Sequence, residues 1–182
     1  SFGEFLQSRL FGPLGMTDTG FYVPDEEYDR LSEVYGFDSE SGAMVPVPFP
    51  SVMFRKETIS FESGGGGLVS TMDDYGRFAQ TNVLKDGQLL SSLGINQGDT
   101  YPGLGMGLTF GTVEAPDEVP SKIPAGSYFW GGAASTWFWI DPVNELYFIG
   151  MVQVFDNNNP KGPLELRETS SAAVYGALSV ED

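Results

Sequence analysis

The chain has 182 residues, of which 41% are hydrophobic and 14% aromatic, and its formal net charge is −16. This length and apolar content suit one domain with a buried core and argue against a disordered chain. The acidic balance disfavours nucleic acid and anionic membrane surfaces as partners, and no apolar run approaches the roughly 20 residues of a membrane span.

Cysteine and histidine are both absent. Disulfides, Ser-His-Asp triads, Cys-His pairs and histidine-ligated metal sites are therefore excluded within the chain. Residues 38–42 and 156–159 faintly resemble calcium loops, but neither has a glutamate at the expected downstream spacing. We interpret both as solvated turns, and we predict neither a metal nor a cofactor.

The chain opens on a capping box formed by Ser1 and Glu4. Apolar residues then recur at helical spacing, which predicts an amphipathic helix from residue 2 to about residue 11 that ends at Gly12-Pro13. The face predicted to be apolar carries Phe2, Phe5, Leu6 and Leu10. Residues 25–34 are a second, weaker helical candidate.

Periodicity is lost between residues 35 and 63, where Pro46, Pro48 and Pro50 predict extended irregular chain. The four glycines at 64–67 that follow predict either a flexible loop or a close-packed floor beneath a site. Thr71 and Asp74 then form a capping pattern for a helix that ends in a turn at 85–88. Its predicted apolar face carries Tyr75, Phe78, Ala79 and Val83.

The segment around the three tryptophans predicts an antiparallel hairpin at the centre of a sheet. Residues 128–142 and 146–155 are rich in aromatic and β-branched side chains, and Asp141 to Asn144 has the composition of a turn. The glycine pair Gly131-Gly132 lies on the first half, where missing side chains allow close approach.

The remaining elements complete an α+β pattern. Residues 104–113 predict a strand with glycine on one face, 156–162 a polar turn and 164–178 a closing helix. Helices come first, strands follow and a helix closes the chain. This order favours an antiparallel sheet flanked by helices over alternating βαβ units.

Four segments, in chain order, resemble the serine β-lactamase-like family, which includes class C β-lactamases, penicillin-binding proteins of the DD-peptidase type and family VIII carboxylesterases. They are residues 11–24, 64–78, 87–91 and 130–142. The resemblance implies the β-lactamase/transpeptidase-like fold. It assigns residues 1–100 to the helical and irregular region, and residues 101–182 to the C-terminal strands and closing helix.

The family's nucleophile motif, Ser-x-x-Lys, and its Tyr-x-Asn motif are both missing from the chain. In the family both lie upstream of the part that this chain resembles. The resemblance therefore implies an incomplete domain, the C-terminal half, whose partner is the N-terminal half of the same protein or the second copy of a swapped dimer. The compartment of the implied bacterial protein is left open between periplasmic or secreted and cytoplasmic.

One functional motif of the family does have a counterpart here. Trp130-Gly131-Gly132 stands where the family has Lys-Thr-Gly or His-x-Gly, as in family VIII esterases. The resemblance implies that these three residues bind substrate, with Trp130 as an apolar wall, and that the Ala133 backbone N–H is an oxyanion donor. Trp130 packing the sheet is the alternative, and we interpret Trp137 and Trp139 as structural.

The resemblance thus implies a serine hydrolase, most simply a carboxylesterase that forms an acyl-serine intermediate on a small ester or amide. A DD-peptidase or weak β-lactamase is the alternative within the same class. From a different class, the chain would be a catalytically silent fragment or binding remnant. The presence of a companion chain that carries Ser-x-x-Lys discriminates between these classes.

Overall fold

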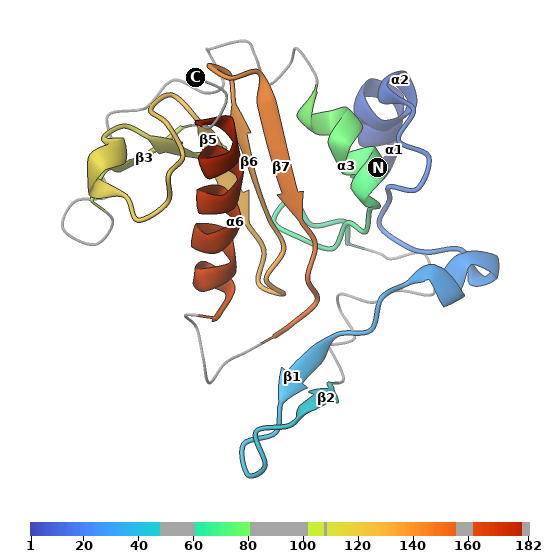
Figure 1. Cartoon of the computed structure of the whole chain (residues 1–182). Coiled ribbons are helices and arrows are strands. Elements are labelled where there is room, and N and C mark those ends of the chain that lie inside the picture. The colour runs from blue at the N-terminus through green and yellow to red at the C-terminus, as the bar shows by residue number, and fades with distance from the viewer. Residues whose placement is uncertain (48–60, 81–101, 108, 156–161, 180–182) are drawn as a thin grey trace. The chain divides into compact units, whose positions relative to one another are not determined.

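The computed structural model describes residues 1–47, 61–80, 102–107, 109–155 and 162–179 (Figure 1). The chain divides into two compact units. Unit 1 comprises residues 1–79 and 153–155, and unit 2 comprises residues 80–152 and 156–182.

Unit 1 begins with three consecutive helical pieces: α1 (Phe2–Leu6), a π-helical turn (Gln7–Phe11) and α2 (Gly12–Leu14). The predicted capping box is confirmed, because the Ser1 hydroxyl accepts from the Glu4 N–H at 3.2 Å while Glu4 accepts from the Ser1 amino group at 2.6 Å. The predicted stop at Gly12-Pro13 is wrong. Proline is tolerated in the first turn of α2, and the helix ends at Gly15, whose φ is 66°.

The apolar face of this first helix was predicted only in part. Phe2 and Phe5 are 40% and 58% exposed, whereas Phe11 and Met16 belong to the core. The π-helical turn contains more residues than an α-helical turn, so it rotates the residues that follow it to a different face. A period of 3.6 residues cannot anticipate that rotation.

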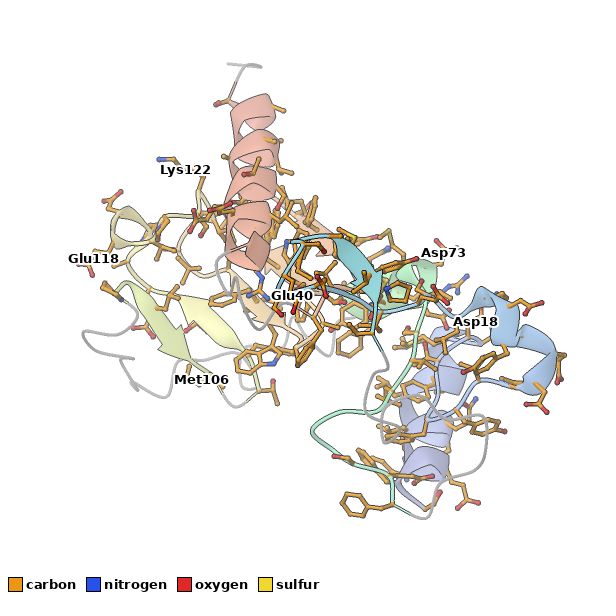
Figure 2. All side chains as sticks on the ribbon, turned by 90° about the horizontal axis from the view of Figure 1, so that it is seen from below. Asp18, Glu40, Asp73, Met106, Glu118 and Lys122 are labelled. Carbon is orange, nitrogen blue, oxygen red and sulfur yellow. The ribbon has the colours of Figure 1, made fainter. Side chains whose placement is uncertain are left out.

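The predicted helix at 25–34 is wrong in type and length, since the structure has only a 3₁₀ helix at Asp25–Arg30. Three acidic residues open this helix, which suits the positive end of its dipole. At its other end Arg30 forms ion pairs with Glu27 and, at 2.8 Å, with Asp18 (labelled in Figure 2).

The stretch predicted to be irregular contains a small hairpin, in which β1 (Tyr35–Phe37) pairs antiparallel with β2 (Met44–Pro46). Pro46 ends β2, where the missing N–H interrupts no ladder. The Asp38 side chain closes the turn between the strands, accepting from the Ser41 N–H at 2.8 Å and the Ser41 hydroxyl at 2.7 Å. These bonds from Ser41 lower the pKa of Asp38.

This turn at 38–42 is thus closed by hydrogen bonds of its own. The described residues hold no group of three or more acidic side chains that could bind a metal ion. The second calcium-like stretch, 156–159, lies outside the described residues, as do Val83, the predicted turn at 85–88 and the family match at 87–91.

Helix α3 (Met72–Ala79) is capped as predicted, because the Thr71 hydroxyl accepts from the Asp74 N–H at 3.3 Å. The buried Asp74 carboxylate makes three further contacts. It accepts from the Asp18 N–H at 2.7 Å, the Thr19 hydroxyl at 2.9 Å and the Arg77 guanidinium at 2.8 Å. One carboxylate therefore ties α3 to the segment that follows α2.

Unit 2 is a five-stranded antiparallel sheet in the order β3-β4-β5-β6-β7, with α6 (Gly162–Leu178) across one face (Figure 1). The strands are β3 (Leu104–Met106), β4 (Gly111–Val113), β5 (Tyr128–Gly131), β6 (Trp137–Asp141) and β7 (Leu146–Gly150). The α+β class and the closing helix are confirmed. None of the described helices is long and apolar enough to cross a membrane.

Two segments that were predicted to be single strands each form two strands in the structure. Residues 104–113 fold back between β3 and β4, where the Gly107 N–H donates to the Phe110 carbonyl at 2.7 Å. Residues 128–142 likewise fold back between β5 and β6. The first turn has no Pro-x-Gly or Asn-Gly signal, and the Gly131-Gly132 signal of the second was interpreted as close approach on a strand.

Strand β6 is buried along its whole length. On the face that α6 covers, Trp137 and Trp139 are 6% and 1% exposed, and the Trp139 ring stacks on Phe148 with centroids 4.3 Å apart. On the opposite face, Phe138 meets the Phe110 ring edge to face at 5.4 Å. Both tryptophans are structural, as predicted.

The predicted turn after β6 is confirmed, and the buried Asp141 organises it. Its carboxylate accepts from the N–H groups of Val143 and Asn144, at 2.9 and 3.1 Å, and from the Asn144 side chain at 2.6 Å. It also accepts from the Tyr175 hydroxyl of α6 at 2.9 Å. Burial, and then this carboxylate, raise the pKa of Tyr175.

We therefore expect Tyr175→Phe to lower the free energy of unfolding by about 1.5–3 kcal/mol, because it removes a hydrogen bond to a buried carboxylate. The control is Tyr147→Phe, which removes an exposed bond to Gln80 and should cost less than about 0.5 kcal/mol. Urea denaturation measures both. Equal losses of unfolding free energy in the two variants would show that the Tyr175–Asp141 hydrogen bond contributes no more than an exposed one.

Candidate active site

The predicted site residues lie where β5 turns into β6. Trp130 and Gly131 are the last residues of β5 and pair with Phe138 and Trp137. Gly132 and Ala133 follow in the turn at 132–136. Ala133, which was expected on the strand, is therefore at the end of a hairpin.

This turn is closed by its own backbone. The Gly132 N–H donates to the Thr136 carbonyl at 2.7 Å, and the Ser135 N–H donates to the Gly132 carbonyl at 3.1 Å. The Thr136 hydroxyl ties the turn to the Val152 carbonyl at 3.3 Å. Ser135 is buried with a φ of 71°, a conformation that costs a non-glycine residue about 1–2 kcal/mol. Ser135 keeps this unfavourable conformation because the surrounding hydrogen bonds hold the turn in place.

Two N–H groups of this turn, those of Ala133 and Ala134, make no hydrogen bond within the described residues. Ala133 is exposed, and within the described ranges its N–H donates no hydrogen bond. A donor held at a fixed position can stabilise a negatively charged oxygen without reorganising. The exposed Ala133 N–H therefore lies in a turn whose backbone is fixed by hydrogen bonds.

Trp130 and Gly131 face opposite sides of the sheet, as successive strand residues do. Trp130 is 46% exposed. Gly131 faces α6: a Cβ atom built on it would lie 2.7 Å from the Cζ and 2.8 Å from an Nη of Arg167. Glycine at 131 thus makes room for Arg167, whereas a Cβ on Gly132 would lie 3.8 Å from its nearest neighbour.

Arg167 is a half-buried cation on α6. Burial lowers its pKa, its buried Nε has no hydrogen-bond partner in the structure as described, and none of the ion pairs there includes it. Sequence reasoning missed this residue. An arginine on an exposed helix has no local signal that distinguishes it, since its contact with Gly131 exists only in the folded chain.

Beside Arg167 lies a pocket of about 470 Å³ that belongs entirely to unit 2. All three tryptophans line it. The other lining residues come from β3 and the residues before it, from the segment before β5, from β5 and β6, and from α6; they are Pro102, Leu104, Glu118, Val119, Pro120, Ser121, Ile123, Phe129, Phe138, Arg167 and Glu168.

Solved structures share this fold. The LovD6 mutant of simvastatin synthase from Aspergillus terreus matches with a TM-score of 0.77 and 20% identity, over 97% of this chain and 50% of that one. EstCE1, a hydrolase with promiscuous acyltransferase activity, matches with a TM-score of 0.75 and 18% identity, over 91% of this chain and 49% of that one. The fold is therefore β-lactamase/transpeptidase-like.

A family model described as Beta-lactamase matches residues 1–171, so the chain belongs to that family. An uncharacterized protein of Mycobacterium tuberculosis is 31% identical in an alignment of 175 positions that covers 82% of this chain and 43% of that protein. The lovastatin esterase of Penicillium rubens is 25% identical in an alignment of 206 positions that covers 97% of this chain and 51% of that protein. The chain spans about half the length of these relatives.

The contact between Gly131 and Arg167 can be tested by a double-mutant cycle. Gly131→Ala places a methyl group where the guanidinium lies, so its cost in unfolding free energy should be about 1 kcal/mol smaller when Arg167 is also alanine.

The control cycle pairs Gly132→Ala with Arg167→Ala and should be additive within about 0.5 kcal/mol, because Gly132 has free space around it. Urea denaturation of the single and double variants gives both coupling energies. Strict additivity at Gly131 would mean that Arg167 does not rest against it.

Proposed function

We propose that this chain is part of a serine hydrolase that cleaves a small carboxylic ester through an acyl-serine intermediate. Membership of the Beta-lactamase family supports the hydrolase class. Likeness to a lovastatin esterase and to the hydrolase EstCE1 supports an ester or acyl-transfer reaction. In this proposal residues 1–100 supply the helical and irregular region, and residues 101–182 supply the strands beside the substrate.

The observation that carries the proposal is the free N–H of Ala133 in a turn fixed by hydrogen bonds. Attack on an ester carbonyl creates a negative charge on its oxygen. A fixed donor stabilises that charge more in the transition state than in the ground state, and so it raises the rate. In the proposed role Ala133 supplies one donor, and the N–H of the nucleophilic serine supplies the other.

Trp130 is proposed as the apolar wall against which the acyl or alcohol group packs, with Gly131 and Gly132 beside it. Its indole is half-exposed at the end of β5, next to the turn that holds Ala133. An exposed aromatic ring is costly to leave in water and suits an apolar substrate group. A cationic side chain in its place would suit a substrate carboxylate, so tryptophan favours the esterase over the alternative peptidase or β-lactamase.

The nucleophile and its base are proposed to come from outside this chain, because no Ser-x-x-Lys or Tyr-x-Asn occurs in its 182 residues. The proposed partner is the N-terminal half of the same protein, or a second copy in a swapped dimer. A penicillin-binding protein homologue from Pyrococcus abyssi, whose structure matches this chain with a TM-score of 0.68, is octameric. A chain that found no such partner would be the catalytically silent alternative.

On this proposal the purified 182-residue chain does not hydrolyse nitrophenyl esters, because it has neither the Ser-x-x-Lys nucleophile nor a histidine base. A fluorophosphonate probe should label none of its serines. Mass spectrometry of the treated chain is the measurement, and stoichiometric labelling at a single serine would contradict the prediction.

In an enzyme reconstituted with its nucleophile-bearing half, Ala133→Pro should lower kcat by roughly a hundredfold, because proline removes the N–H. Ala133→Ser keeps the N–H and is the matched control, which should keep nearly full kcat. Circular dichroism and slower but complete labelling of the nucleophile would show that the Ala133→Pro variant remains folded. Full kcat in a folded Ala133→Pro enzyme would remove Ala133 from the proposed mechanism.

A further inference from the structure

The pocket of about 470 Å³ in unit 2 has an aromatic floor. Phe129, Trp137 and Trp139 line it, and all three belong to the core cluster on the face of the sheet that α6 covers. Its volume lies within the range of about 300–1,000 Å³ that is typical of small-molecule sites. The pocket is therefore large enough for an aryl or short alkyl group.

Three buried donors of residues that line this pocket have no acceptor in the part of the chain that the structure describes. They are the Nε of Arg167 and the indole N–H groups of Trp137 and Trp139. Trp137 is only 6% exposed, so water has little access to its ring. A buried donor without an acceptor is unfavourable, and a ligand oxygen placed between such donors removes that cost.

The charges around the pocket favour an anionic ligand group. Arg167 is half-buried, burial lowers its pKa, and it forms no ion pair with the residues that the structure describes. Glu118 and Glu168 also line the pocket, but both are exposed, and Figure 2 shows Glu118 at the outer margin of unit 2. Solvent screens exposed charges more than buried ones, so the guanidinium dominates inside the pocket.

We propose that this pocket binds a small carboxylate with an aryl or short alkyl body. The carboxylate pairs with the guanidinium of Arg167, a geometry in which two parallel hydrogen bonds form. The apolar body lies against the half-buried Phe129 and the other apolar side chains that line the pocket. This binding requires no nucleophile, and so it is independent of the proposed hydrolase activity.

Phenylbutyrate and phenylbutanol are matched probes, since they share an aryl body and differ in the charged group. Titration calorimetry on the 182-residue chain should give an affinity about tenfold or more higher for the acid, because only the acid forms charge-assisted bonds with Arg167. Tryptophan fluorescence should change on the same titration, because all three tryptophans line the pocket. Equal affinity for acid and alcohol, or no binding of either, would overturn the proposal.

Arg167→Met should abolish the preference for the acid. Lys122→Met is the matched control, because Lys122 is an exposed cation between two lining residues, Ser121 and Ile123, and should leave the preference intact. Ser121→Trp should fill the pocket and weaken both probes while Arg167 remains. Retention of the preference in Arg167→Met, or unchanged binding in Ser121→Trp, would refute the site.

Discussion

The burial of β6 on both faces is the constraint on which unit 2 depends. A strand with two apolar faces suits the interior of a sheet, and here β5 and β7 pair with β6 on either side. Trp137 and Trp139 then require a cover, which α6 and Phe148 provide. The Tyr175–Asp141 bond joins this cover to the end of the same strand. The ends of β6 therefore fix both the turn that holds Ala133 and the turn that holds Asn144.

The parts of the fold that the sequence predicted are those with a local chemical cause. A hydroxyl three residues before a carboxylate predicts a cap, as at Ser1, and Asp141-Pro142 predicts a turn wherever it occurs. The turn at 132–136 was missed because its one local signal, Gly131-Gly132, was assigned to a strand. Ser135 adopts a left-handed conformation that glycine or asparagine normally signals, and tertiary contacts rather than intrinsic preference hold it there.

The sequence predicted which residues form the candidate site, but it did not predict their contacts. The resemblance located Trp130, Gly131, Gly132 and Ala133, but it gave no reason for each residue type. The structure supplies a reason for Gly131, since the space that its side chain would fill belongs to Arg167. That contact joins residues from different elements, so no pattern of spacing contains it. A glycine at a candidate site can therefore also be required by a side chain on the opposite face of the sheet.

Strain and preorganisation are linked at this turn. A donor contributes to catalysis only if its direction is set before the reaction, and a turn of small residues would normally be too mobile for that. Here Ser135 is in a left-handed conformation, and hydrogen bonds that involve Gly132, Thr136 and Val152 offset its free-energy cost. These bonds also fix the turn. Gly132 and Ser135 use their own N–H groups to close the turn, and within the described residues the N–H groups of Ala133 and Ala134 between them make no hydrogen bond. The bonds that offset the strain therefore also hold the backbone around Ala133 in place.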